Sequence, residues 1–159
     1  MKFSEEALRF LNLGIESEIA AYVFYKKVIS LVRDPSLEET LKTLANDEKG
    51  HFLTLEAEFD RNVRSECWVV YRDTLSKPGL PDLDELIQTT HKELLARIAS
   101  LKTTRDILEM ALSLEREALA LFSDAAARTD DPELKKVFDY LVAFEKGHVQ
   151  LIESQLART

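Results

Sequence analysis

The chain has 159 residues, of which 45% are hydrophobic and 31% are charged, and its formal net charge is -8. This length suffices for one domain, residues 1–159, with a substantial core, and the negative charge disfavours nucleic acid, since such binding depends largely on Lys and Arg. No secretory signal and no uncharged apolar run of about 18 residues is found, so we expect a cytoplasmic protein that does not insert into a membrane.

Four long helices are predicted, because Gly and Pro, at four residues each, are too few for a fold with many turns. The predicted helices span residues 4–32, 35–65, 104–129 and 132–157, and a crossover over residues 66–103 contains a further helix at about 83–100. Each pair of helices is broken at an Asp-Pro, Asp34-Pro35 or Asp131-Pro132, where Asp can cap the incoming helix and Pro can occupy its first turn. The crossover is long enough to run the length of a bundle.

Charged side chains occupy core positions in all four long helices. In the second and fourth helices, a Glu-x-x-His motif continues an apolar seam with the three-and-four spacing of a buried helix face. The first and third helices each carry a lone Glu on their apolar face. These six residues are Glu18, Glu48, His51, Glu115, Glu145 and His148.

The two halves of the chain align without a gap at a constant offset of 97 residues. Residues 11–60 and 108–157 share 12 identities in 50, and these identities cluster at the Asp-Pro pairs and the Glu-Lys-Gly-His segments. Repetition at a fixed offset indicates a duplicated structural unit. The sequence therefore predicts an all-α four-helix bundle built from two duplicated helical hairpins, joined by a long crossover that contains an extra helix.

The six charged core residues predict a site for two metal ions. Carboxylates buried in an apolar seam are strongly destabilising unless opposite charge compensates them, and two divalent cations would neutralise four carboxylates. Residues i and i+3 of a helix project from one face, so each Glu-x-x-His motif can hold one ion. One imidazole and several carboxylate oxygens per ion suit iron or manganese. The spacing leaves open which two carboxylates bridge the ions.

Other residues have simpler interpretations. Gly50 and Gly147 precede the two motif histidines and carry a helix-propensity cost of about 1 kcal/mol each relative to Ala, so we expect a close helix approach beside the site to require them. His91 is expected at the surface. Cys67 is the single cysteine, which excludes a disulfide within the chain.

The residue pattern resembles the ferritin-like superfamily and is most similar to its rubrerythrin-type diiron proteins. The resemblance is carried by a lone Glu with an aromatic residue seven positions later, Glu18 to Tyr25 and Glu115 to Phe122, and by the two Glu-x-x-His motifs. It implies a ferritin-like four-helix bundle with two iron ions on the six core residues. The four metal-bound carboxylates would then serve catalysis, and Tyr25 would line the pocket.

The chain departs from rubrerythrins in two respects, although the resemblance covers roughly residues 5–157. The sequence has no pair of Cys-x-x-Cys motifs, so we expect a protein without their rubredoxin-like iron domain. Ala118 stands where these proteins tend to carry an additional carboxylate. The two-histidine pattern is nearer to bacterioferritin-type sites.

The resemblance implies an oxidoreductase that protects against oxidative stress by reducing hydrogen peroxide or dioxygen. Electrons would come from a separate donor protein, and the chain would form a homodimer. The alternatives are a ferroxidase that handles iron, a dimanganese catalase, and a helical scaffold that has lost its chemistry. For the cofactor, manganese or a mixed metal pair is the alternative to two iron ions. If metal binds, it should raise thermal stability, and protonation of His51 and His148 near about pH 5–6 should weaken its binding.

Overall fold

The computed structural model describes residues 3–63 and 91–159. Its elements are α1 (Glu5–Val28), the 3₁₀ turn η1 (Ile29–Leu31), α2 (Pro35–Val63), α5 (Lys92–Ala99), α6 (Thr104–Arg128) and α7 (Pro132–Leu156). Neither described stretch contains a strand. The predicted crossover helix is seen over Lys92–Ala99, and its first half lies outside the described residues. None of the described helices is long and apolar enough to span a lipid bilayer.

The two Asp-Pro pairs start helices in the predicted way. Asp34 Oδ1 accepts a hydrogen bond from the backbone N–H of Ser36 at 2.9 Å. Asp131 Oδ1 accepts from Glu133 N–H at 3.0 Å and from Leu134 N–H at 2.9 Å. The first N–H groups of a helix have no partner within the helix, so these carboxylates satisfy donors that would otherwise depend on water. Each cap therefore fixes the point at which the second helix of a hairpin begins.

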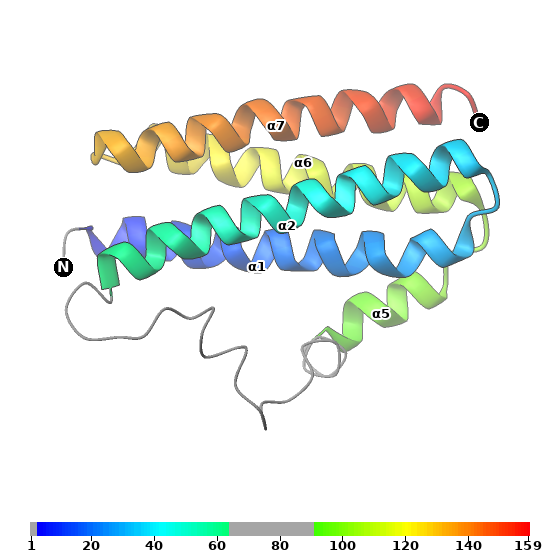
Figure 1. Cartoon of the computed structure of the whole chain (residues 1–159), viewed down its shortest axis with the longest axis horizontal. Helices are drawn as coiled ribbons and strands as arrows, with labels where there is room; N and C mark the ends of the chain where they lie inside the picture. Colours follow the sequence, from blue (N-terminus) through cyan, green and yellow to red (C-terminus); the bar gives the residue numbers. More distant parts are fainter. Residues whose placement is uncertain (1–2, 64–90) are drawn as a thin grey trace.

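Two helical hairpins form the bundle (Figure 1). Helix α1 packs along α2 in the first hairpin, and α6 packs along α7 in the second. The hairpins meet mainly through α1 and α6, while α2 and α7 make a less extensive contact, and α5 packs against α1. This arrangement confirms the predicted all-α bundle of two hairpins with an additional helix in the crossover.

Two hydrophobic clusters fill the bundle, one toward each end. The first includes Phe24, Tyr25, Leu41, Leu44, Ile107, Leu108 and Ile152, and the second includes Phe10, Leu11, Leu55, Phe122, Phe138 and Leu141. On α2, Glu48 and His51 lie between Leu44 of the first cluster and Leu55 of the second. The other three long helices carry their predicted charged residues between the clusters in the same way. A polar layer, closed off at both ends by apolar packing, therefore crosses the middle of the bundle.

The glycines before the two histidines do not mark a close helix approach. A Cβ atom built at Gly50 or Gly147 would find no heavy atom within 4 Å, so that expectation is wrong. The tight position is Gly14 on α1, where a Cβ atom would lie 2.9 Å from Phe122 Cε1 and 3.1 Å from Leu55 Cδ1. Gly14 is thus the residue that allows α1 to approach its neighbours closely.

Alanine substitutions at Gly14 and Gly147 should change stability in opposite directions. Gly147→Ala should stabilise the metal-free protein by about 1 kcal/mol through helix propensity alone. At Gly14 the same gain is outweighed by overpacking of about 1–3 kcal/mol, because Phe122 and Leu55 are fully buried. Urea unfolding of the metal-free variants measures both effects. A Gly14→Ala variant more stable than wild type would contradict the packing that we describe.

Candidate metal centre

The six predicted site residues meet in the polar layer between the hydrophobic clusters. Helix α1 supplies Glu18, α2 supplies Glu48 and His51, α6 supplies Glu115, and α7 supplies Glu145 and His148. None of the six exposes more than 5% of its surface. Within each Glu-x-x-His motif the two residues lie about one helical turn apart, so both side chains project from the same face. The layer therefore gathers carboxylates and imidazoles from all four long helices.

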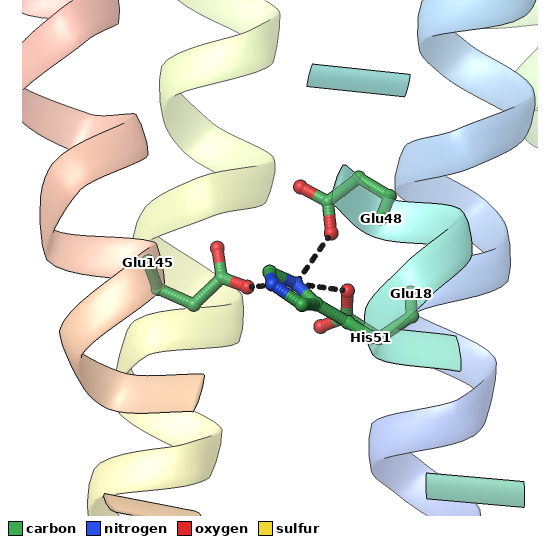
Figure 2. Close-up of side chains that lie close together, drawn as sticks. All are labelled: Glu18, Glu48, His51 and Glu145. Carbon is green, nitrogen blue, oxygen red and sulfur yellow. Dashed lines mark hydrogen bonds and ion pairs between the residues drawn. The ribbon is translucent and has the colours of Figure 1, made fainter. Parts of the chain in front are cut away.

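The first group of contacts surrounds His51 (Figure 2). Its Nδ1 lies 3.2 Å from Glu18 Oε2, 3.4 Å from Glu48 Oε2 and 3.3 Å from Glu145 Oε1. Glu145 reaches this group from the second hairpin, whereas the other three residues belong to the first. The ligand atoms that these four residues offer all lie within 4.8 Å of one another. That spacing is compact enough for one metal ion.

The second group surrounds His148 and repeats the first. His148 Nδ1 lies 3.2 Å from Glu48 Oε1, 3.3 Å from Glu115 Oε2 and 3.4 Å from Glu145 Oε2. Here Glu48 is the residue that comes from the other hairpin. The four ligand atoms of this group also lie within 4.8 Å of one another. The layer thus contains two adjacent groups, each able to hold one ion.

Glu48 and Glu145 belong to both groups. Each directs one carboxylate oxygen toward His51 and the other toward His148. Glu18 contacts only the first histidine and Glu115 only the second. The spacing of the sequence left the bridging pair open, and the geometry favours Glu48 and Glu145, since these two have an oxygen on each side of the layer.

The carboxylates of the layer have too few hydrogen-bond donors for their burial. Glu18 Oε1, Glu48 Oε1 and both oxygens of Glu145 are buried and accept no hydrogen bond. Buried oxygen atoms without a partner destabilise the fold, and buried charges do so more strongly. Two divalent cations would provide both the missing partners and the opposite charge. The donor set in this chain therefore fits a dinuclear metal site.

Without metal, the four carboxylates differ in protonation. Burial raises the pKa of Glu115 to about 9. Burial, reinforced by a hydrogen bond with Glu48, also raises the pKa of Glu18 well above its ordinary value. Burial acts on Glu48 and Glu145 in the same direction, but close contacts with protonated neighbouring side chains outweigh it and hold both pKa values below the ordinary range. The shared carboxylates are thus the anionic ones.

Both imidazoles are cationic in the metal-free layer. Burial lowers the pKa of His51, but close contacts with the three surrounding glutamates outweigh it and raise the pKa to about 12. The pKa of His148 is raised against the effect of burial by its own three glutamates. Two imidazolium ions therefore balance the charges of the two shared carboxylates. With one additional proton on each neutral imidazole and one proton on each of Glu18 and Glu115, the metal-free layer has no net charge.

Tyr25, predicted to line the pocket, reaches the layer from α1. Its side chain is fully buried, and its O–H donates a hydrogen bond to Glu115 Oε1. Burial, together with the charge that Glu115 carries once it ionises, raises the pKa of the phenol well above its ordinary value, so the phenol remains a donor. The equivalent residue of the second half is Phe122, which has no hydroxyl to offer Glu18. The two groups are therefore alike in their carboxylates and different in the residues around them.

Asp47 also reaches the layer, although its sequence context did not mark it as a site residue. Its Oδ2 lies 3.1 Å from His148 Nε2. At the equivalent position of the second half, Phe144 packs edge-on against His51 with ring centroids 5.0 Å apart, and Tyr140 lies 6.3 Å from the same imidazole. A comparison of positions 47 and 144 at the 97-residue offset is the signal that could have revealed this difference.

Comparison with known proteins relates the chain to bacterioferritin. No protein-family model matches the sequence. Bacterioferritin from Rhodobacter capsulatus is 27% identical over 163 residues, covering 99% of this chain and 86% of that protein. A solved structure of R. capsulatus bacterioferritin, with a metal-free dinuclear site and haem iron, matches with a TM-score of 0.65 at 25% identity, covering 99% of this chain and 87% of that chain.

Two further solved structures share the fold at lower identity. A ferritin-like diiron-carboxylate protein from Bacillus anthracis matches with a TM-score of 0.65 at 19% identity over 96% of each chain. A DUF305 fragment from Deinococcus radiodurans matches with a TM-score of 0.73 at 13% identity over 100% of each chain. The chain thus has the ferritin-like four-helix fold found in diiron-carboxylate proteins. The narrower rubrerythrin-type resemblance stays a prediction.

Proposed function

We propose that the chain binds two ferrous ions in the polar layer and oxidises them, acting as a ferroxidase in iron handling. The observation that carries this proposal is the pair of buried groups joined by Glu48 and Glu145, each of which offers one oxygen to either group. Similarity to a bacterioferritin over nearly the whole chain supports iron as the metal. It also supports iron handling over the peroxide reduction that a rubrerythrin-type resemblance implies.

The six residues would share the two ions symmetrically. Glu18 and His51 would hold one ion, and Glu115 and His148 would hold the other. Glu48 and Glu145 would each bind both ions. Four anionic carboxylates would balance the charge of two divalent ions, and the two imidazoles would bind as neutral ligands, which suits a layer sealed between two hydrophobic clusters. Tyr25 would keep the terminal carboxylate of the second ion oriented through its hydrogen bond to Glu115.

Iron is the substrate of this reaction, and its electrons balance with those of the oxidant. Each ferrous ion loses one electron, and two electrons with two protons reduce dioxygen to hydrogen peroxide, or reduce hydrogen peroxide to two water molecules. Oxidation adds two positive charges to a buried layer whose carboxylates matched only the ferrous state. Uncompensated charge at this depth is unfavourable, so the layer favours departure of the ferric product.

Two partly exposed aromatic side chains lie beside His51. Tyr140 and Phe144 pack over this imidazole, yet they expose 49% and 37% of their surface. Side chains at the surface change rotamer on the picosecond to nanosecond timescale. Movement of these two aromatic side chains would therefore offer an oxidant or a ferrous ion a route to the first group.

The proposal is tested by loading the metal-free protein anaerobically with ferrous iron and then adding dioxygen. We expect two ferrous ions per chain and an oxidation rate at least about tenfold above that of the same iron in buffer. A chain that binds no iron would overturn the proposal. Sustained consumption of hydrogen peroxide with a small reductant would instead favour the peroxidase, and manganese in protein purified without added metal would favour the catalase.

The fate of the ferric product depends on assembly. Storage of iron requires a closed shell of many subunits, whereas a homodimer, as the sequence leads us to expect, would pass the iron on. Native mass measurement of the purified protein separates these two forms of iron handling.

A further inference from the structure

The two halves of the site differ in what lies behind each imidazole. His148 Nε2 lies 3.1 Å from Asp47 Oδ2. His51 Nε2 is buried and has no hydrogen-bond partner. Asp47 and Phe144 occupy equivalent positions in the duplicated halves, each directly before the Glu of its Glu-x-x-His motif. The otherwise repeated site is therefore asymmetric at one pair of positions.

In each imidazole, the hydrogen-bond partner of one ring nitrogen affects how strongly the other ring nitrogen binds metal. In both groups Nδ1 faces the glutamates, so Nδ1 is the atom available to an ion and Nε2 points away from it. A carboxylate that accepts a hydrogen bond from Nε2–H fixes the tautomer of the imidazole and holds the ring in place. It also makes Nδ1 a stronger metal ligand. Loss of such a partner typically weakens metal binding by about 10–100-fold.

Only His148 has this support among the described residues. Behind His51, the Phe144 ring lies at 5.0 Å and is inclined by 79° to the imidazole. An aromatic ring is a far weaker acceptor than a carboxylate, so it can hold the imidazole by packing but does not fix its tautomer. The negative charge of Asp47, whose side chain is 35% exposed, adds a further attraction for a cation on the His148 side.

We propose that the two metal positions are unequal: the position at His148 fills first and keeps its ion, and the position at His51 is the one that exchanges. This inference rests on the proposed two-metal site. Asp47 contacts His148 and not the ion, so it is a positioning residue. The aromatic pair Tyr140 and Phe144 lies beside His51, whose Nε2 has no hydrogen-bond partner among the described residues.

Titration of the metal-free protein with Co²⁺ under anaerobic conditions tests this inequality, because the visible spectrum of Co²⁺ reports the occupied positions. We expect two binding steps separated by at least about tenfold in affinity. Crystals prepared with one equivalent of Co²⁺ should show the anomalous scattering peak at His148. Asp47→Asn should weaken the tighter step by about 10–100-fold and leave the other unchanged, and Asp47→Glu should restore part of the loss.

A matched control and a reciprocal variant separate positioning from general effects of charge or folding. Asp139→Asn removes an exposed carboxylate of α7 that pairs with Lys135, and it should change neither step. Phe144→Asp places a carboxylate behind His51. It should strengthen the weaker Co²⁺ binding step, so that the affinities of the two steps become more alike. Circular dichroism confirms that each variant is folded before titration.

The outcomes distinguish this inference from the proposed function. Two equal steps in the wild type, or equal weakening of both steps in Asp47→Asn, would overturn the inequality while leaving the two-metal site intact. A first ion located at His51 would do the same. Failure of the wild type to bind any Co²⁺ would overturn the proposed metal site itself.

Discussion

Glu48→Gln should abolish the binding of both metal ions, whereas Glu18→Gln should remove only one. Glu48 contacts both histidines, with Oε2 at 3.4 Å from His51 Nδ1 and Oε1 at 3.2 Å from His148 Nδ1. Glu18 contacts only His51, at 3.2 Å. Neutral glutamine keeps the shape of the side chain but leaves each ion short of negative charge. Metal analysis after equilibrium dialysis gives the number of ions per chain.

The control for this pair is Glu117→Gln. Glu117 lies on α6 two residues beyond Glu115, but it is exposed, and its Oε1 accepts a hydrogen bond from Ser113 Oγ at 3.1 Å. This variant should keep both ions. If Glu18→Gln lost two ions and Glu48→Gln only one, the terminal and bridging carboxylates would be the reverse of the pair that we describe.

Metal-free and metal-loaded protein should respond to pH in opposite directions. A group whose pKa is higher in the folded state stabilises the fold below its unfolded value, and this stabilisation is lost as the pH rises through the folded value. For Glu115 this stabilisation is lost between about pH 4.5 and about pH 9, and for His51 it is lost between about pH 6.5 and about pH 12. The metal-free protein should therefore melt at lower temperature at pH 8 than at pH 6.5. Bound metal replaces these protons, so metal binding should strengthen over the same range.

Thermal melting followed by circular dichroism, with and without Co²⁺, measures this difference. At a free metal concentration about 100-fold above the dissociation constant, each site contributes about 2.7 kcal/mol. Two sites should then raise the melting temperature by about 10–20 °C for a chain of this size. A pH-indicator dye should record the release of up to four protons per chain on loading, one from each His and one from each of Glu18 and Glu115.

Two results would contradict this account of the layer. One is a metal-free protein whose stability rises steadily from pH 6.5 to pH 8. The other is metal binding with no proton release at neutral pH. The expectation from sequence, that protonation of His51 and His148 near about pH 5–6 weakens metal binding, follows from unperturbed histidines. The buried carboxylates around His51 extend that competition to much higher pH.

The fold could be predicted because a few local signals agreed with the duplication. The Asp-Pro pairs carry a cap and a first-turn proline in two residues, and this combination marks a hairpin break in each half. The end of the first helix carries no such signal. Its α-helical hydrogen bonding stops at Val28 and a 3₁₀ turn continues to Leu31, within the single predicted helix over residues 4–32. Choosing between these two backbone patterns depends on local packing, which the apolar spacing does not record.

The candidate site could be found from sequence because buried carboxylates stand out in an apolar seam. The bridging pair could not, because it depends on the direction in which each carboxylate is turned between facing helices. Asp47 has the sequence context of an ordinary solvated acidic residue, and only the packing of α2 against α7 brings it to His148. The role expected of Gly50 was wrong for a related reason, since its position on the helix face does not show whether another element lies opposite.

Each metal group takes three residues from one hairpin and one from the other. The first hairpin supplies three members of the first group, which are Glu18, Glu48 and His51. The fourth member, Glu145, comes from the second hairpin. If both halves descend from one ancestral hairpin, that ancestor could complete a site only by pairing with a second copy of itself. Self-association and metal binding would then have been a single selectable property before gene fusion. Fusion would then have freed the two copies to diverge, and the difference between Asp47 and Phe144 would be one result of that divergence within the site.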